Sequence, residues 1–262
     1  MNTTRLRPAV LVLALAAAIP LSAVAQFQRA PLTPIGQKIE TAMQSDIRTP
    51  EEKARDAERR PRETLEFFRL RDDMRVIELM PSGGWYTKIL GPVLADKGEL
   101  YVAIGAERGI APLIKNVPSM SKVKIAKSTE KLIPSKTQVG LFDVGPFSLG
   151  VSNADLVLTF RNLHNFTPEG RANLDNAVFN ALKSGGLYGV VDHMRRHNEP
   201  DNPENGRRVD PVQAIKEIQA AGFVFVDYSN VNYRPDDELR YEVGRKSVTG
   251  NTDRFTMLFR KP

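Results

Sequence analysis

Short apolar runs alternate with amphipathic stretches over most of the chain. The clearest run covers residues 76–80, is interrupted only by Glu78, and is typical of a buried parallel strand. A Pro-Ser-Gly-Gly turn at residues 81–84 ends it, and the apolar spacing over residues 85–94 predicts an amphipathic helix. A strand, a glycine turn and a helix place backbone N–H groups at the carboxyl end of the strand, where nucleotides and other polar ligands bind. A glycine pair alone is more typical of a plain turn, but the alternation that follows favours a binding site.

The same alternation continues to the C-terminus. Strands are predicted at residues 99–104, 139–143, 154–160, 187–192, 223–228 and 255–259, and helices at residues 35–43, 51–60, 61–68, 111–115, 167–182 and 210–220. Residues 122–127 also alternate like a strand, but we prefer residues 139–143 as the third strand because an acidic residue ends them. Strands alternating with helices predict a doubly wound, mostly parallel sheet with helices on both faces. The charged helix over residues 51–60 is expected to lie solvated on the domain.

Two polar segments interrupt the second half of the chain. Residues 194–209 form an insertion rich in Arg, Asn and Pro. Residues 230–252 are too long and irregular for a plain turn, so they are expected to be functional or mobile. They either cover a binding site, through side chains such as Arg234 and Tyr241, or form ordinary surface.

The first residues have the three parts of a secretory signal peptide, which we assign to residues 1–25. Arg5 and Arg7 supply the positive start, residues 9–21 the apolar centre, and Ala-Val-Ala at residues 23–25 the cleavage site. The apolar centre is too short for a comfortable membrane span. We therefore expect no stable span after cleavage and a periplasmic or secreted location.

Length and composition set further limits. The 262 residues, of which 41% are hydrophobic, suffice for one large α/β domain or two small ones. We predict an N-terminal helical or extended segment, residues 26–60, and a main domain, residues 61–262. The net charge of +6 falls to +4 without the two arginines of the signal peptide, and no basic block is interleaved with aromatics, so nucleic-acid binding is not expected. The absence of cysteine excludes disulfides and thiolate chemistry.

The order of motifs along the chain resembles that of the class I S-adenosylmethionine-dependent methyltransferases, and most of all a group of predicted methyltransferases that carry export signals. The resemblance covers roughly residues 50–262 and rests on four blocks, residues 76–87, 154–165, 182–193 and 252–262. It implies a Rossmann-like, seven-stranded sheet with one antiparallel strand near the end. It also implies S-adenosylmethionine as the cofactor and a small-molecule or envelope substrate.

The resemblance assigns residues to the cofactor by position. Glu78 matches the acidic residue that ends the family's first strand, near the methionine moiety. Gly84 matches the third glycine of the family's loop, where a larger residue is expected to block the cofactor. Met80 and Ser82 stand at the two earlier glycine positions, although Gly83 adds a glycine beside them. The complete set implied to bind the cofactor is Glu78, Pro81, Gly83, Gly84, Glu107, Asp143, Phe160, Arg161 and Asn162.

Some members of this set are less direct matches than others. The family's second strand ends in an acid that holds the ribose hydroxyls, but residues 104 and 105 are Ile and Gly here, and Glu107 is the nearest carboxylate. Asp143 is assigned to the adenine side because it ends the expected third strand. Residues 160–162 border both cofactor and substrate in the family.

Methyl transfer needs positioning of the reactants and, for some acceptors, a general base. His164 follows the fourth strand and His193 the fifth, so both are expected at the ligand-binding edge of the sheet with Asp192. These three are the predicted catalytic group, with His164 as the first choice for the base and Asp192 as its orienting carboxylate. Each could instead hydrogen-bond loop backbone only. A metal site is less favoured, because no close-spaced ligand pair lies on a helix.

Two functions are compatible with these observations. The first is an exported methyltransferase, favoured by Glu78, Gly84 and the near-complete order of motifs. The second is a methyltransferase-like fold reused as a periplasmic ligand-binding protein without methyl transfer. The altered glycines, the missing ribose acid and a location without an obvious supply of cofactor favour the second. A hydrolase is disfavoured because no Gly-x-Ser-x-Gly motif is present.

Overall fold

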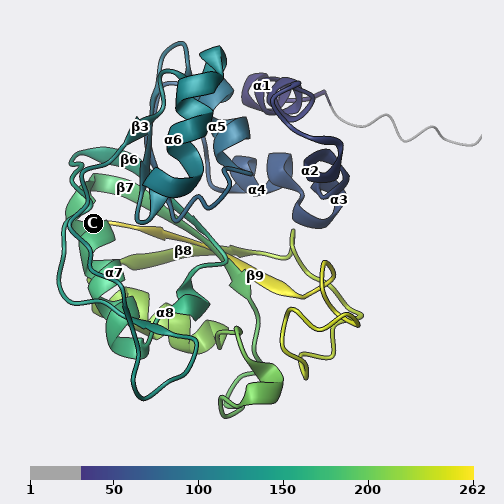
Figure 1. The fold of residues 1–262 in the computed structure, drawn as a ribbon, viewed down its shortest axis with the longest axis vertical. Helices are drawn as coiled ribbons and strands as arrows, with labels where there is room; N and C mark the ends of the chain where they lie inside the picture. The colour runs from purple at the N-terminus through teal and green to yellow at the C-terminus, as the bar shows by residue number, and fades with distance from the viewer. Residues whose placement is uncertain (1–30) are drawn as a thin grey trace, which may run out of the picture. The chain divides into compact units, whose positions relative to one another are not determined.

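A seven-stranded sheet runs through the centre of the chain, for which a computed structural model describes residues 31–262 (Figure 1). Its strands lie in the order β3 (Lys124–Ile125), β2 (Glu99–Ala103), β1 (Arg75–Leu79), β6 (Ala154–Phe160), β7 (Leu182–His193), β9 (Arg254–Arg260) and β8 (Val224–Ser229). β9 pairs in the antiparallel sense with both β7 and β8, and the other neighbours pair in parallel. The predicted doubly wound, mostly parallel α/β sheet is therefore confirmed. The predicted signal peptide, residues 1–25, lies outside the described residues.

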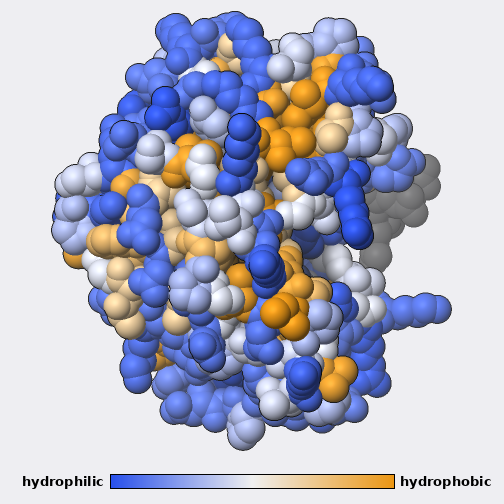
Figure 2. Space-filling view, turned by 60° about the vertical axis from the view of Figure 1, so that its left-hand side comes forward, coloured by the Kyte–Doolittle hydropathy of each residue, from blue (hydrophilic) through white to orange (hydrophobic). Residues whose placement is uncertain are grey.

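Helices cover both faces of the sheet (Figure 1). One face is covered by α1 (Pro34–Met43), α4 (Pro61–Phe67), α5 (Thr87–Leu94) and α6 (Ala106–Asn116), and the other by α7 (Pro168–Ala181) and α8 (Pro211–Ala220). Successive residues of a strand point to opposite faces, so Leu156 and Leu158 of β6 belong to one apolar core and Val157 to the other. Polar residues cover most of the surface shown in Figure 2, with smaller apolar patches between them.

The structure corrects the prediction for the third strand. Residues 124–125 form β3 beside β2, so the alternation over residues 122–127 is the correct signal. The preferred segment, residues 139–143, instead ends in β5 (Phe142–Asp143), which pairs with β4 (Ile133–Pro134) in a separate two-stranded sheet. Val139 is fully exposed whereas Val123 and Ala126 are buried, and only the buried residues can anchor a strand on the core.

The N-terminal helices belong to the same compact unit as the sheet, which spans residues 32–262. The predicted boundary after residue 60 lies inside this unit. The charged stretch that was expected to form one helix forms two short ones, α2 (Pro50–Ala54) and α3 (Asp56–Arg59). A capping box at Thr49 begins α2, because its side chain and that of the third helical residue satisfy each other's backbone N–H groups.

These two helices pack on the domain through Trp85. Its Nε1 donates a hydrogen bond to the backbone oxygen of Glu52, 3.1 Å away. The guanidinium carbon of Arg59 lies 4.3 Å from the centre of the Trp85 ring, and Arg59 is buried. The expectation of a solvated helix is therefore wrong, since Arg59 is used as a packing residue.

The polar segments are held to the domain by arginines. A buried ion pair joins the two of them: Arg208 donates two hydrogen bonds, of 2.8 and 3.0 Å, to the carboxylate of Asp237. Arg234 donates to the backbone oxygens of Ala57 and Glu58, so residues 230–252 contact α3.

Short 3-10 helices lie at Pro118–Met120, Leu163–Asn165 and Pro203–Asn205. Within residues 31–262, none of the helices combines the length and apolar character that crossing a membrane requires.

Candidate functional site

Three central strands, β1, β2 and β6, each end immediately before a residue with left-handed backbone. These residues are Met80, Ile104 and Arg161, with φ of +47°, +65° and +65°. Left-handed backbone costs a non-glycine residue ~1–2 kcal/mol, and a β-branched residue such as Ile104 adopts it rarely. Such strain concentrates at functional sites, and here it marks the carboxyl edge of the sheet, where doubly wound folds bind their ligands.

The loop after β1 alternates between left-handed and ordinary backbone. Met80, Ser82 and Gly84 stand at the positions of the three family glycines and have φ of +47°, +54° and +82°. All three positions therefore have left-handed backbone, including the two that carry methionine and serine. Gly83 faces open space, since a Cβ added there would meet no atom within 4 Å.

Helix α6 packs directly on this loop. A Cβ added to Gly109 would lie 1.9 Å from the carbonyl oxygen of Ser82, so only glycine fits at that point of the helix. A Cβ added to Gly84 would lie 2.9 Å from Cδ1 of Ile110. Packing of α6 and the left-handed backbone therefore both favour glycine at position 84, and the expected approach of a cofactor to this residue stays a prediction.

A cavity of about 550 Å³ opens between this loop, the end of β6 and helices α2 and α3; we call it the loop cavity. Six residues predicted to bind the cofactor line it: Glu78, Pro81, Gly83, Phe160, Arg161 and Asn162. Arg55 and Arg59 of the N-terminal helices line it as well. Neither was predicted, because their segment carries no motif that points to a site.

Glu78 lines the loop cavity and is 2% exposed. The hydroxyl of Thr87 donates a hydrogen bond to Glu78 Oε2 over 2.6 Å. Burial raises the pKa of Glu78 to about 7, while this hydrogen bond acts in the opposite direction. The carboxyl is thus close to half protonated at neutral pH, and a cation in the cavity would favour its charged form.

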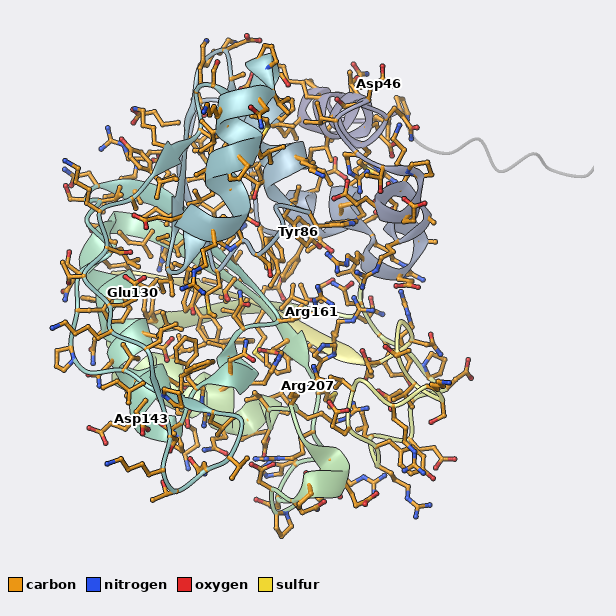
Figure 3. The ribbon with its side chains drawn as sticks, in the orientation of Figure 1. Asp46, Tyr86, Glu130, Asp143, Arg161 and Arg207 are labelled. Atoms are coloured by element: carbon orange, nitrogen blue, oxygen red, sulfur yellow. The ribbon has the colours of Figure 1, made fainter. Side chains whose placement is uncertain are left out.

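Aromatic rings and an amide fix the shape of the same cavity. Tyr86 stacks on Phe160 with ring centres 3.5 Å apart and planes 8° from parallel. Asn162 donates from Nδ2 to the backbone oxygen of Leu79 over 3.1 Å, which joins the ends of β6 and β1. Figure 3 shows Tyr86 and Arg161 in the central part of the structure, at this edge of the sheet. These contacts hold the lining residues in fixed orientations.

A second cavity, of about 770 Å³, lies at the end of β2 and is called here the second-strand cavity. Gly105, Glu107 and Glu130 are among the residues that line it. Glu130 Oε1 accepts a hydrogen bond from the backbone N–H of Gly105 over 3.2 Å. Glu130 Oε2 is buried and has no hydrogen-bond partner within residues 31–262. A carboxylate therefore reaches the carboxyl end of β2, although no acidic residue ends the strand itself.

Sequence reasoning missed Glu130 and placed Asp143 on the adenine side instead. Glu130 follows β3, so the strand that was set aside carried the signal for it. Asp143 lies in β5, where its carboxylate accepts a hydrogen bond from the Thr167 hydroxyl over 2.9 Å at the start of α7. Figure 3 shows Asp143 away from Tyr86 and Arg161. The structure places Asp143 at the cap of a helix rather than with the other predicted cofactor residues.

The three predicted catalytic residues come together at the ends of β6 and β7. Asp192 Oδ1 lies 2.6 Å from Nδ1 of His164, and Asp192 Oδ2 accepts from the His164 backbone N–H over 3.2 Å. The backbone N–H of His193 donates to Asp192 Oδ1 over 2.7 Å. Asp192 thus orients His164 with Nδ1 toward the carboxylate, which leaves Nε2 as the nitrogen available to a ligand.

The two histidines differ in what they face. His193 Nδ1 lies 2.8 Å from the hydroxyl of Thr252, and burial, followed by the charge of His164, lowers the pKa of His193 well below its ordinary value. His164 lines a smaller cavity of about 180 Å³, the histidine cavity, and is absent from the lining of the loop cavity. Within residues 31–262, His, Asp and Glu side chains form no group of three arranged as a metal site.

The chain is similar to known proteins in its fold. No protein-family profile and no curated protein sequence matches the chain. It is similar in structure to a SAM-dependent methyltransferase from Aquifex aeolicus, with 15% identity and a TM-score of 0.55 over 86% of this chain and 97% of that one. It is similar to the [4+2]-cyclase SpnF, with 15% identity and a TM-score of 0.55 over 84% and 86% of the two chains. Human N-acetylserotonin methyltransferase in complex with SAM shows 13% identity and a TM-score of 0.50 over 87% of this chain and 56% of that one.

These likenesses confirm the predicted Rossmann-like fold of the class I methyltransferases. Two of the three proteins are methyltransferases, and one was solved with SAM bound. The third is named for a [4+2] cyclisation, so the same fold also occurs in a protein with another named activity.

Gly109→Ala tests the packing of α6 on the loop. Alanine normally stabilises a helix interior relative to glycine, but the added methyl would lie 1.9 Å from the Ser82 oxygen. We expect the variant to lose ~1–3 kcal/mol in the free energy of unfolding, measured with urea. Gly83→Ala is the matched control and should stay near the wild type. A gain of stability in Gly109→Ala would contradict the contact.

Glu78→Gln tests the buried carboxyl. A pKa raised from 4.5 to about 7 means that the folded state binds the proton more tightly, so stability falls as pH rises from 4.5 to 7. The difference corresponds to roughly 3 kcal/mol above pH 7. Glutamine still accepts a hydrogen bond from Thr87 and carries no charge. The free energy of unfolding of the variant relative to the wild type, measured with urea, should therefore be higher at pH 8 than at pH 5. An equal difference at the two pH values would show that Glu78 titrates normally.

Proposed function

We propose that the chain is an S-adenosylmethionine-dependent methyltransferase that acts on a small-molecule or envelope substrate. The observation that carries the proposal is Glu130, whose buried and unpartnered oxygen stands at the end of β2. A vicinal diol such as that of a ribose would supply the missing donors. The left-handed loop between the two cavities supports the same assignment.

The residues at this edge fit the cofactor in two parts. The second-strand cavity would take the nucleoside, with Glu130 accepting from the ribose hydroxyls. The loop cavity would take the amino-acid part, with Glu78 balancing its positive charge and Asn162 and Tyr86 shaping the wall. When bound, S-adenosylmethionine supplies an electrophilic methyl group. The protein's own contribution is to orient the two reactants and exclude water around them.

His164 is the proposed general base for the acceptor. Its Nδ1 faces Asp192, so Nε2 is free to receive a proton, and Asp192 stabilises the charge that results. Asp192 and His193 are positioning residues in this proposal, since the carboxylate is used by both histidines.

Export is the second part of the proposal. The positive start, the apolar centre and the Ala-Val-Ala site within residues 1–25 support it. A periplasmic or secreted methyltransferase would then receive its cofactor outside the cytoplasm. This supply is a separate requirement that the binding measurements below do not depend on.

The second candidate function is a ligand-binding protein with the same fold and no methyl transfer. The observation that favours it is the position of His164, which lines the histidine cavity and not the loop cavity. The [4+2]-cyclase among the similar structures shows that the fold also occurs under another named activity. Ligand binding without turnover would distinguish this function from the first.

Calorimetric titration with S-adenosylmethionine and S-adenosylhomocysteine tests the cofactor site. We expect micromolar binding, and Glu130→Gln should weaken it by about 10- to 100-fold because a hydrogen bond to a charged acceptor is lost. Glu107→Gln is the matched control, since Glu107 lines the same cavity, and should change affinity less than about threefold. The opposite order of effects would make Glu107 the ribose acid, and no binding by folded protein would reject the cofactor.

His164→Ala tests the proposed base. Transfer of a labelled methyl group is measured with an acceptor found by screening small molecules and envelope extracts. We expect the affinity for S-adenosylhomocysteine to be unchanged. Turnover should fall by a factor of roughly 10²–10⁴, which is the contribution of a positioned base. His197→Ala, which removes a half-exposed histidine bonded to Asp210, should behave as the wild type. Equal turnover in both variants would leave His164 with a structural role only.

A further inference from the structure

Three arginines from distant parts of the chain lie around the buried Tyr86. They are Arg59 in α3, Arg161 directly after β6, and Arg254 at the start of β9. Burial raises the pKa of Tyr86 to about 12, and the positive charges of these three residues act against that shift. Arg59 and Arg161 line the loop cavity, while Arg254 is buried behind them.

None of the three guanidinium groups forms an ion pair within residues 31–262, whereas the other buried arginines of this part of the chain each pair with a carboxylate: Arg48, Arg171 and Arg208. Arg59 is 5% exposed, and its Nε is buried without a hydrogen-bond partner in the same part of the chain. Its guanidinium is held over the Trp85 ring, which orients it without using its hydrogen-bond donors. Arg254 donates only to the backbone oxygen of Thr252.

The arrangement brings like charges together in a poorly solvated place. Burial, then the charges of Arg161 and Arg55, lower the pKa of Arg59 to about 9. Burial, then Arg161, lower the pKa of Arg254 to about 10. An arginine remains charged at neutral pH even so, and buried like charges without counterions destabilise a fold. An anion between them would offset both the burial and the repulsion.

The carboxylates near the cavity form no ion pair with these arginines within residues 31–262, although the charges of Asp192 and Glu58 act on Arg161. Glu52 accepts hydrogen bonds from Lys88 over 2.7 and 2.9 Å. Glu58 forms an ion pair with Arg55 at 3.5 Å. Glu78 is itself buried and half protonated near neutral pH. The guanidinium groups of Arg59 and Arg161 in the loop cavity are therefore available to bind an anionic ligand.

We propose that Arg59 and Arg161 bind a carboxylate or phosphate group of a ligand in the loop cavity. The planar guanidinium matches either group through two parallel hydrogen bonds. This inference deepens the proposed function and rests on it for the identity of the ligand that carries the anion. The anion belongs either to the amino-acid part of the cofactor or to the methyl acceptor, and both sources share the same chemistry.

Inorganic phosphate alone is the first probe. Thermal unfolding is measured in 20 mM phosphate against chloride at equal ionic strength, so general screening cancels. For a dissociation constant of ~1 mM the wild type should gain about 4–7 °C in Tm. Arg59→Gln and Arg161→Gln should each lose this gain, relative to their own baseline in chloride, which separates anion binding from any loss of stability. Arg71→Gln, an exposed arginine paired with Asp73, is the control and should keep it.

Two nucleosides then identify the source of the anion. S-adenosylhomocysteine carries a carboxylate, whereas 5′-methylthioadenosine has the same nucleoside without the amino acid. If Arg59→Gln weakens the first by about tenfold or more and spares the second, the anion is the cofactor's carboxylate. If Arg59→Gln binds both nucleosides as tightly as the wild type does but has lost the phosphate effect, the anion belongs to the methyl acceptor.

Equal phosphate protection of the wild type, Arg59→Gln and Arg161→Gln would overturn the proposal, as would no protection of the wild type. A phosphate effect that depends on both arginines, without binding of either nucleoside, would keep the anion site and reject the methyltransferase function. The two proposals therefore fail separately.

Discussion

Strands β1, β2 and β6 leave the sheet through left-handed residues, and the register of the sheet decides where these turns fall. Leu79 pairs with Ala103 on one side and with Thr159 on the other, so the turns after β1 and β2 begin at the same level and the turn after β6 begins one residue further along. Backbone hydrogen bonds hold the strained residues: Met80 donates to Ala103, and Arg161 donates to Val191 over 2.7 Å. The strain is thus supported by the paired strands, and the turned backbone opens the space that both larger cavities use.

The N-terminal helices complete that space. Trp85, in the first turn after the loop, donates a hydrogen bond to α2, and the guanidinium of Arg59 packs on its ring. Residues 230–252 hold the other end, through Arg234 and the last carbonyls of α3. The lining of the loop cavity then carries both guanidinium groups, of Arg59 and Arg161, and a protonatable carboxyl, that of Glu78. A ligand with separated positive and negative groups matches this distribution.

The sequence predicts the buried strands well because they are apolar and bounded by turn residues. It fails at β3, where a two-residue strand at the sheet edge carries Lys124 and has only a weak apolar pattern. The meeting of His164 and Asp192 could be predicted because His164 follows β6 and Asp192 lies near the carboxyl end of β7, its parallel neighbour. Arg59 could not, since its segment carries no motif that points to a site, and Glu130 could have been found only by taking residues 122–127 as the third strand. The left-handed backbone at Met80 and Ser82 runs against local preference, and only the surrounding sheet and α6 impose it.

The position of β9 bears on how the chain is made. It is the last strand in the sequence, yet it lies between β7 and β8 and pairs with both. β8 therefore has no neighbour in the sheet until residues 254–260 have left the ribosome. Domains commonly begin to fold during synthesis from the N-terminal side. Here the sheet cannot close until residues 254–260 have been made, so the growing chain keeps an open edge at β7 until then.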